Sequence, residues 1–384
     1  MDPLVVIGTG LAGFNLVKEL RKLDKETPVV MLTADDGRNY SKPMLSTGFT
    51  KEKTADELAM APPEKTAEQF DAEVRTGVQV TAIDRQAKEV VLADGERLRY
   101  SRLVLAWGAD VFRPPLEGDA LDRVFSVNDL MDYGRFREEL DKGCQKVLII
   151  GGGLIGCEFA NDLTNGGFRV ELVEPEGRCL PALIPEPCSR AVAEGLEEIG
   201  VTFHFGPLVR RVDRREDGGV RATLSDGTTV DADIVLSAVG LRPRTEMAKE
   251  AGLEVNRGIV VDRMLRTSDP DIFALGDCAE VEGQVLPYVL PLMAAARALS
   301  KTLSGEETPV AYGVMPVTIK TPACPVVCYG PPVGADGEWE YEIDGRNIRA
   351  LFRDPEGQPR GYALTGEAVN EKMKLNKEMP PILE

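Results

Sequence analysis

The chain has 384 residues, of which 43% are hydrophobic and 28% charged, and its formal net charge is −18. Its length and composition are typical of a globular protein with two or three domains. Its acidity argues against binding to nucleic acid or to an anionic membrane, both of which attract basic surfaces. The first predicted strand begins at Leu4, too early for a signal peptide, and no run of about 18 apolar residues follows. We therefore expect a cytoplasmic protein.

Histidine and cysteine usage excludes several further classes of enzyme. The single histidine, His204, falls in a predicted strand and is expected to be structural, which excludes Ser-His-Asp and Cys-His mechanisms and most histidine-metal chemistry. The seven cysteines are scattered without metal-ligand spacing. We expect them to be reduced thiols, and no structural zinc is implied.

The chain carries an internal duplication of a βαβ unit. The first copy is a strand, a glycine turn, a helix and a strand, at residues 4–7, 8–13, up to about 23, and 28–33. The second copy has the same order, at residues 146–150, 151–156, up to about 164, and 169–174. Two such units predict two folds that each bind a nucleotide.

The residues between and after the two units also follow a repeated order. Short β-like runs over 78–100 lead to a strand over 103–107, and similar runs over 220–230 lead to a strand over 234–239. The chain then returns to the first domain, ends it with an apolar helix over 290–303, and closes with a short β-rich region. The sequence thus predicts an α/β protein with two Rossmann-like dinucleotide-binding domains, for FAD and NAD, and a small C-terminal α+β domain. The expected boundaries are 1–112 with 241–310 (FAD), 113–240 (NAD) and 311–384.

The first glycine motif is Gly8, Thr9, Gly10, Leu11, Ala12 and Gly13, which follows a strand and precedes a helix. Its glycines permit a tight turn and let backbone N–H groups approach a pyrophosphate, which the helix N-terminus attracts. The alternative, a glycine turn without a ligand, is disfavoured by the strand–turn–helix context. An acidic residue is expected directly after the second strand of this unit. Thr33, Ala34 and Asp35 occupy that place, so the acidic residue either comes late or is replaced.

The second glycine motif contains Gly151, Gly153 and Gly156, and Glu174 closes the strand that follows. A carboxylate there accepts hydrogen bonds from ribose hydroxyls and repels a 2′-phosphate, which favours NADH over NADPH. Arg178 is near Glu174 in the sequence, and an arginine there can bind a 2′-phosphate, so NADPH stays an alternative.

A third motif, Gly276-Asp277 after an apolar strand, completes a resemblance that covers essentially the whole chain. With it the chain resembles the two-dinucleotide-domain flavoprotein reductases, above all rubredoxin reductases and flavorubredoxin reductases. The residues that carry the resemblance are the two glycine turns, Tyr40 to Ser46, Leu105 to Gly108, Val239 to Pro243, and Gly276-Asp277. Their order is far more specific than any one motif.

The resemblance implies roles for individual residues. It assigns Thr9 to Ala12 and Asp277 to the FAD pyrophosphate and ribityl chain, and Thr33, Ala34 and the backbone of Val80 to the adenosine end. Lys42 is expected beside the isoalloxazine ring and Glu158 where nicotinamide meets flavin, as a catalytic ion pair that steadies the ring. The alternatives are a solvated lysine and a glutamate that stabilises a helix's first turn. Val289 and Lys320 are expected at the pyrimidine edge of the flavin, although a surface strand lysine is nearly as plausible for Lys320.

The absence of a redox cysteine from Tyr40 to Gly48 points to the electron acceptor. Disulfide reductases of this architecture need a redox cysteine pair beside the flavin, and the related peroxidases and oxidases need one cysteine in this segment. Neither a C-x-x-C motif nor a C-terminal histidine occurs in this chain. Cys324 and Cys328 are interpreted as packing thiols. The reduced flavin should therefore pass electrons directly to an external acceptor.

We expect an FAD-dependent NADH:rubredoxin oxidoreductase. The alternatives are a reductase of flavorubredoxin, ferredoxin or a quinone-like molecule, and a flavin-binding interaction protein that responds to NADH. Docking of an acidic rubredoxin should be small, transient and partly apolar. The lysines that could help are Lys320, Lys372, Lys374 and Lys377, although a solvated amphipathic surface explains the last three somewhat better.

Overall fold

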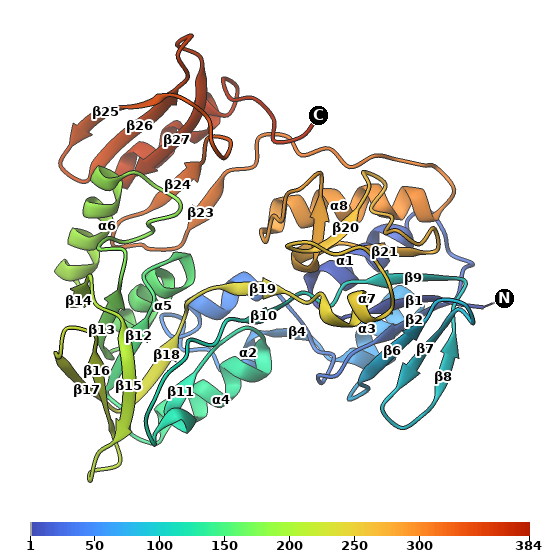
Figure 1. Cartoon of the computed structure of the whole chain (residues 1–384), viewed down its shortest axis with the longest axis horizontal. Helices are drawn as coiled ribbons and strands as arrows, with labels where there is room; N and C mark the ends of the chain where they lie inside the picture. The colour runs from blue at the N-terminus through green and yellow to red at the C-terminus, as the bar shows by residue number, and fades with distance from the viewer. Residues whose placement is uncertain (1) are drawn as a thin grey trace.

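The first of two parallel sheets gathers strands from distant parts of the chain in the computed structural model, which describes residues 2–384 (Figure 1). Its strand order is β21-β9-β1-β2-β5, and all four pairings are parallel. The strands are β1 Leu4–Ile7, β2 Val29–Leu32, β5 Glu73–Arg75, β9 Arg102–Leu105 and β21 Ile272–Ala274. β1, β2 and β9 are almost wholly apolar and buried because both faces of the sheet are covered.

Helices and a small antiparallel sheet supply that cover. Helix α1 (Leu11–Leu20) packs against α8 (Val289–Leu303), and both share a core with the parallel strands. The antiparallel sheet contributes Ile83, Val90 and Leu92 to the same core. Its strands are β6 Val80–Asp84, β7 Glu89–Leu92 and β8 Arg97–Arg99. α1 ends three residues before the predicted end at about residue 23.

The second parallel sheet repeats the first and confirms the predicted duplication. Its order is β11-β18-β12-β13-β14, with every pairing parallel. The strands are β11 Val124–Phe125, β12 Lys146–Ile150, β13 Arg169–Glu174, β14 Thr202–Phe205 and β18 Ile234–Ser237. Helices and an antiparallel sheet again cover it: α4 Leu130–Asp141, α5 Leu154–Asn165, α6 Glu186–Glu198, β15 Val209–Arg214, β16 Val220–Leu224 and β17 Thr229–Ala232.

A short two-stranded ribbon carries the chain between the two sheets in both directions. β10 (Ala109–Val111) leads out of the first sheet and pairs antiparallel with β19 (Leu241–Pro243), which leads back. The ribbon lies between the two halves in Figure 1. The returning chain then forms α7 (Glu246–Glu250), β20 (Ile259–Val261) and β22 (Ala279–Val281).

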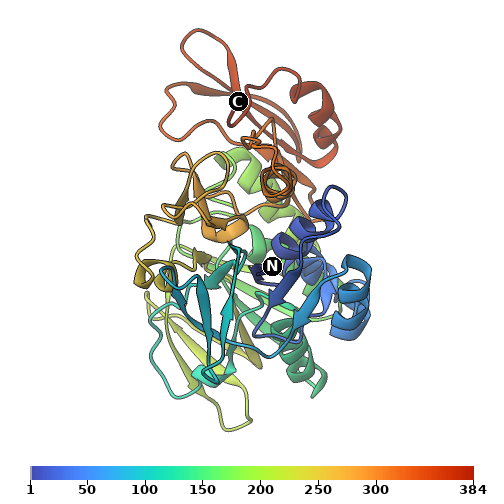
Figure 2. The same ribbon diagram turned by 90° about the vertical axis from the view of Figure 1, so that its right-hand side faces the viewer.

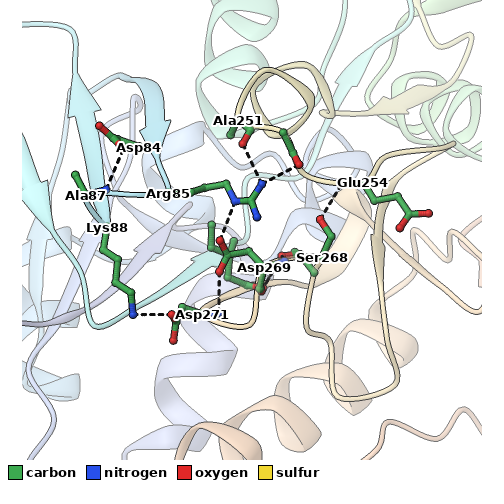
Figure 3. A network of polar contacts seen from close by, with 12 residues as sticks. Asp84, Arg85, Ala87, Lys88, Ala251, Glu254, Ser268, Asp269 and Asp271 are labelled. Carbon is green, nitrogen blue, oxygen red and sulfur yellow. Dashed lines mark hydrogen bonds and ion pairs between the residues drawn. The ribbon is translucent and has the colours of Figure 1, made fainter.

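Polar contacts fasten the returning segment to the turn after β6 (Figure 3). The Arg85 guanidinium donates to the Asp269 carboxylate at 2.8 Å and to the carbonyl oxygen of Gly252 at 2.9 Å. Lys88 pairs with Asp271 at 2.6 Å. These contacts explain how residues far apart in sequence complete one fold.

The C-terminal residues form an antiparallel sheet of order β23-β24-β27-β26-β25. Its strands are β23 Val317–Ile319, β24 Val326–Tyr329, β25 Glu338–Asp344, β26 Asn347–Arg353 and β27 Pro359–Thr365, followed by the 3-10 helix η4 Gly366–Glu371 and helix α9 Lys372–Leu375. One face packs on α6 of the second fold. The view in Figure 2, at a right angle to that of Figure 1, shows this sheet at one end of the molecule. The α/β class with a small C-terminal α+β part is confirmed.

The segment that carries Lys42 is built from short elements between β2 and β5. It contains β3 Asn39–Tyr40, the 3-10 helix η1 Lys42–Thr47, α2 Ala55–Leu58, β4 Ala59–Ala61 and α3 Pro63–Phe70. Two further 3-10 helices are η2 Leu121–Arg123 and η3 Gly276–Cys278. Among residues 2–384 no helix is both long enough and apolar enough to cross a membrane.

Candidate active site

The N-termini of α1 and α5 form two open cradles for an anion. Each helix begins after a glycine, Gly10 or Gly153, and neither has a capping side chain or an acidic residue in its first turn. A Cβ atom built on either glycine would meet no atom within 4 Å. Their first N–H groups are left without capping partners, as an anion-binding helix N-terminus requires. The residues present therefore fit a dinucleotide pyrophosphate at each turn.

The outer glycines of each turn are needed for close packing. A Cβ on Gly13 would lie 2.0 Å from the carbonyl oxygen of Gly8, and one on Gly156 would lie 1.9 Å from that of Gly151. No side chain fits at either contact, so the helix can start directly against its strand.

The start of β6, which carries Val80, lies beside the end of β2, which leads to Thr33 and Ala34. The backbone N–H of Val78 donates to the carbonyl oxygen of Thr33 at 2.8 Å, which places the start of β6 beside the end of β2. Thr33 is buried and Ala34 exposed. The two segments assigned to the adenosine end therefore adjoin through the Val78–Thr33 hydrogen bond.

The register of the two sheets shows which residue replaces the acid in the first fold. Ile7 pairs with Leu32 and Ile150 with Val173, so Thr33 occupies the position of Glu174. Asp35 reaches back instead, and its Oδ1 accepts hydrogen bonds from the hydroxyls of Thr33 at 2.7 Å and Thr9 at 3.4 Å. Asp35 is therefore part of this site, although the sequence comparison of the two units pointed only to a late or missing acid.

In the second fold, Glu174 and Arg178 have separate surroundings. The buried Glu174 carboxylate accepts N–H bonds from Gly152 at 2.6 Å and Glu176 at 2.8 Å, which fixes it against the glycine turn. The Arg178 guanidinium donates to the carbonyl oxygens of Ile184 at 2.7 Å and Pro181 at 2.8 Å. Its donors are used by the loop that follows.

Asp277 lies beside the first cradle and faces Lys42. A Cβ on Gly276 would approach the Cβ of Ala12 to 3.0 Å, so the Gly276-Asp277 turn packs on the first turn of α1. The Lys42 ammonium lies 3.8 Å from the Asp277 carboxylate and donates to Asn128 Oδ1 at 2.8 Å. Burial lowers the pKa of Lys42, and Asp277 opposes that shift.

Glu158 pairs with Lys320, and the expected Lys42–Glu158 ion pair was wrong. Glu158 is 1% exposed; its Oε2 accepts the Ser46 hydroxyl at 2.5 Å and forms the ion pair with the Lys320 ammonium. Its Oε1 accepts the backbone N–H of Lys320 at 2.9 Å. Lys42 is held by Asp277 and Asn128 instead, whereas the chain that leaves β23 places Lys320 against α5.

Val289 is the first residue of α8 and is 39% exposed. The helix starts without a capping side chain or an acidic residue in its first turn, and Leu292 lies 3.7 Å from the Cβ position of Gly276. A third uncapped helix N-terminus therefore lies beside the Gly276-Asp277 turn, where it favours negative charge.

The cysteines lie in apolar cores. Six of the seven are buried, and burial raises the pKa of the Cys278 and Cys328 thiols to about 12. Cys324 and Cys328 are each 2% exposed, which confirms that they are packing thiols. Within residues 2–384 no group of three or more His, Cys, Asp or Glu side chains is arranged to hold a metal ion. The Nε2–H of His204 donates to the Glu171 carboxylate at 2.6 Å on the sheet surface.

Comparison with known proteins agrees with this geometry. Residues 2–300 match the model of the family described as pyridine nucleotide-disulphide oxidoreductase, and residues 309–379 match a rubredoxin-binding C-terminal domain. A rubredoxin-NAD(+) reductase of Alcanivorax borkumensis is 66% identical over all of both chains. A nitric oxide reductase FlRd-NAD(+) reductase of Vibrio vulnificus is 40% identical over 98% of both chains.

A solved structure shows the same arrangement of elements. A ferredoxin reductase from Rhodopseudomonas palustris superimposes with a TM-score of 0.89, covers 99% of this chain and 96% of its own, and is 26% identical. The chain therefore belongs to the pyridine nucleotide-disulphide oxidoreductase family.

Proposed function

We infer that the chain is an FAD-dependent NADH:rubredoxin oxidoreductase that takes hydride from NADH and passes single electrons to rubredoxin. The observation that carries this conclusion is one chain that joins two open glycine cradles to a segment matching the rubredoxin-binding domain at residues 309–379. FAD occupies the first fold and NADH the second.

The protein contributes residues that would hold FAD in place and polarise its ring. Bound FAD accepts a hydride and releases electrons singly, which matches a two-electron donor to a one-electron carrier. Thr9 to Ala12 would bind its pyrophosphate at the α1 N-terminus, and Asp277 and Lys42 would hold the ribityl chain. Lys320 and the N-terminus of α8 at Val289 would favour the negative charge of the reduced pyrimidine. Glu158 fixes Lys320 through an ion pair and would lie on the nicotinamide side.

Electrons leave without a sulfur relay. Residues 40–48 contain no cysteine, and burial raises the pKa of the Cys278 thiol to about 12. A small carrier therefore docks directly over the flavin edge. Exposed apolar side chains and local lysines suit a transient contact between two acidic proteins, and Lys372, Lys374 and Lys377 contribute to it.

Glu174 sets the preference for NADH in this proposal. Replacing Glu174 with alanine removes a carboxylate that accepts ribose hydroxyls, so kcat/KM for NADH should fall by about 10-fold or more while the value for NADPH rises. Steady-state kinetics with both nucleotides measures the ratio. Glu176→Ala, in the exposed neighbouring position, is the matched control and should leave it unchanged. An unaltered ratio in Glu174→Ala would contradict the assignment, because Arg178 is already occupied by loop carbonyls.

Turnover with purified acceptors tests the function. The FAD-loaded enzyme and NADH should reduce rubredoxin rapidly and ferredoxin slowly, followed by stopped-flow absorbance. Faster reduction of flavorubredoxin would make that the acceptor, an alternative favoured by the Vibrio vulnificus relative. Rapid bleaching of the flavin with no fast acceptor would instead indicate an NADH-responsive interaction protein.

The division into domains at 1–112 with 241–310, 113–240 and 311–384 belongs to the same proposal. So does a cytoplasmic location, which the seven free thiols support because reducing compartments maintain them.

A further inference from the structure

One face of α5 carries three buried polar side chains in the interior of the molecule. Glu158 and Asn161 are each 1% exposed and Asp162 is 3% exposed. Their spacing of three and four residues puts them on one face of the helix. Because buried polar groups need partners, this face must be matched by donors from other parts of the chain.

Asp162 binds the end of the segment that carries Lys42 and Ser46. Its Oδ2 accepts the backbone N–H of Phe49 at 3.0 Å and its Oδ1 accepts that of Thr50 at 2.8 Å. Burial raises the pKa of this carboxyl, and the hydrogen bonds from Thr50 and Phe49 oppose the shift. A buried acid is thus used to fix two backbone positions directly after η1.

Asn161 binds the segment that carries Lys320. Its Oδ1 accepts the backbone N–H of Ala323 at 3.0 Å, three residues beyond Lys320, whose own N–H donates to Glu158. The close approach is reinforced from α6, since a Cβ on Gly195 would lie 2.8 Å from the carbonyl oxygen of Ala323. A single helix therefore holds two segments from opposite ends of the sequence.

We propose that Asp162 and Asn161 are positioning residues of the flavin site, through which α5 sets the placement of Lys42, Ser46 and Lys320. Neither side chain touches a cofactor in this scheme. The N-terminus of the same helix forms the NADH cradle, so one rigid element aligns the hydride donor with the groups around the acceptor. The inference rests on the proposed function, because it concerns the rate of hydride transfer from NADH to FAD.

The chemistry of the substitution Asp162→Asn defines the expected effect. Asparagine is nearly the same size as aspartate, but it has one acceptor oxygen in place of two. Its NH2 group would therefore face one of the two backbone N–H donors, and two donors cannot form a hydrogen bond. Phe49 or Thr50 must then move, and the segment that carries Lys42 and Ser46 moves with it. A misplacement of about 1 Å costs on the order of 10²-fold in rate when reacting groups must be aligned.

The test compares Asp162→Asn with Asp233→Asn as FAD-loaded proteins. Asp233 also accepts two backbone N–H groups, those of Gln145 at 2.7 Å and Lys146 at 2.8 Å, but through Oδ2 alone, so one amide oxygen can replace it. It joins β12 to the start of β18 and contacts neither lysine segment. Anaerobic stopped-flow at saturating NADH gives the rate of flavin reduction. Hydrogen exchange of the Phe49 and Thr50 amides and the visible circular dichroism of bound flavin report position without turnover.

Asp162→Asn should reduce the flavin at least about tenfold more slowly, with faster exchange of the two amides, an altered flavin circular dichroism and wild-type FAD content. Asp233→Asn removes a carboxylate of the same kind but keeps an oxygen for both of its N–H donors, so its rate should stay within about twofold of wild type. Equal rates in Asp162→Asn and wild type, or an equal loss in both variants, would overturn the proposal.

If Asp162→Asn fails to bind FAD, a second pair of variants tests the proposal. Asn161→Leu removes the acceptor for the Ala323 N–H and should slow flavin reduction. Asn347→Leu removes an acceptor for the Glu367 N–H at 2.9 Å in the C-terminal sheet and should keep the rate. Equal rates in that pair would also overturn the proposal. Wild-type flavin that NADH does not reduce would refute the proposed function itself, so the two failures are distinguishable.

Discussion

Gly10→Val is expected to give a folded protein that binds no FAD and is colourless. A Cβ at Gly10 meets no protein atom within 4 Å, and the residue has a φ of −74° that valine adopts freely, so the fold has room for the side chain. That room lies where backbone N–H groups approach the pyrophosphate, and the branched side chain would fill it. Flavin absorbance after dialysis against FAD measures the loss.

Gly313→Val is the matched control for this substitution. Gly313 is exposed, and a Cβ there likewise meets nothing within 4 Å. It lies in the approach to the C-terminal sheet, so its variant should retain one FAD for each chain. Stoichiometric FAD in Gly10→Val would show that the turn is misassigned, provided that far-UV circular dichroism shows both variants to be folded.

Lys320→Met is expected to lower the free energy of unfolding by about 3 kcal/mol, because it leaves the Glu158 carboxylate buried without its cation. Glu158 is 1% exposed while the Lys320 side chain is 29% exposed, so the stranded charge is on the buried partner. The same change removes the cation assigned to the flavin edge, and flavin reduction by NADH should slow by about 10²-fold. Urea denaturation and stopped-flow reduction measure the two effects.

The double variant Glu158→Gln with Lys320→Met separates the two roles. It removes the stranded charge, so stability should recover in part while the rate of flavin reduction stays low. Arg190→Met breaks an ion pair with Glu186 whose side chains are 67% and 71% exposed, and it should change stability by less than about 0.5 kcal/mol. Equal losses in Lys320→Met and Arg190→Met would contradict the importance of the buried pair.

Local patterns predicted the parts of the site that local sequence builds. The glycine turns, their strands and the Glu174 position depend on residues within about 30 positions of each other, and the strand–turn–helix order identifies them. The registers of the two sheets then show that Thr33 holds the position in the first fold that Glu174 holds in the second, as the duplication implied. Asp35 was noted but not placed, because only the folded turn brings its carboxylate to Thr9.

The pairing at Glu158 could not be read from sequence in the same way. Lys320 is 162 positions away, and no local pattern states that β23 ends against α5. The choice of Lys42 as partner came from a resemblance, whereas packing of the C-terminal sheet against α5 places Lys320 beside the Glu158 carboxylate. Asn161 and Asp162 look like a solvated helix surface in the sequence, and only the buried donors of Phe49, Thr50 and Ala323 show otherwise.

The split origin of the first sheet has a consequence for synthesis on the ribosome. β12, β13, β14 and β18 emerge in one continuous stretch, so the second fold can close while the first still lacks β21 and the α8 cover of α1. About 170 residues separate β9 from β21, which at typical translation rates leaves an apolar helix and an open strand edge exposed for roughly 10 to 30 s. Newly made chains should therefore depend on chaperones during that interval, and FAD should load only after residue 277 has left the exit tunnel.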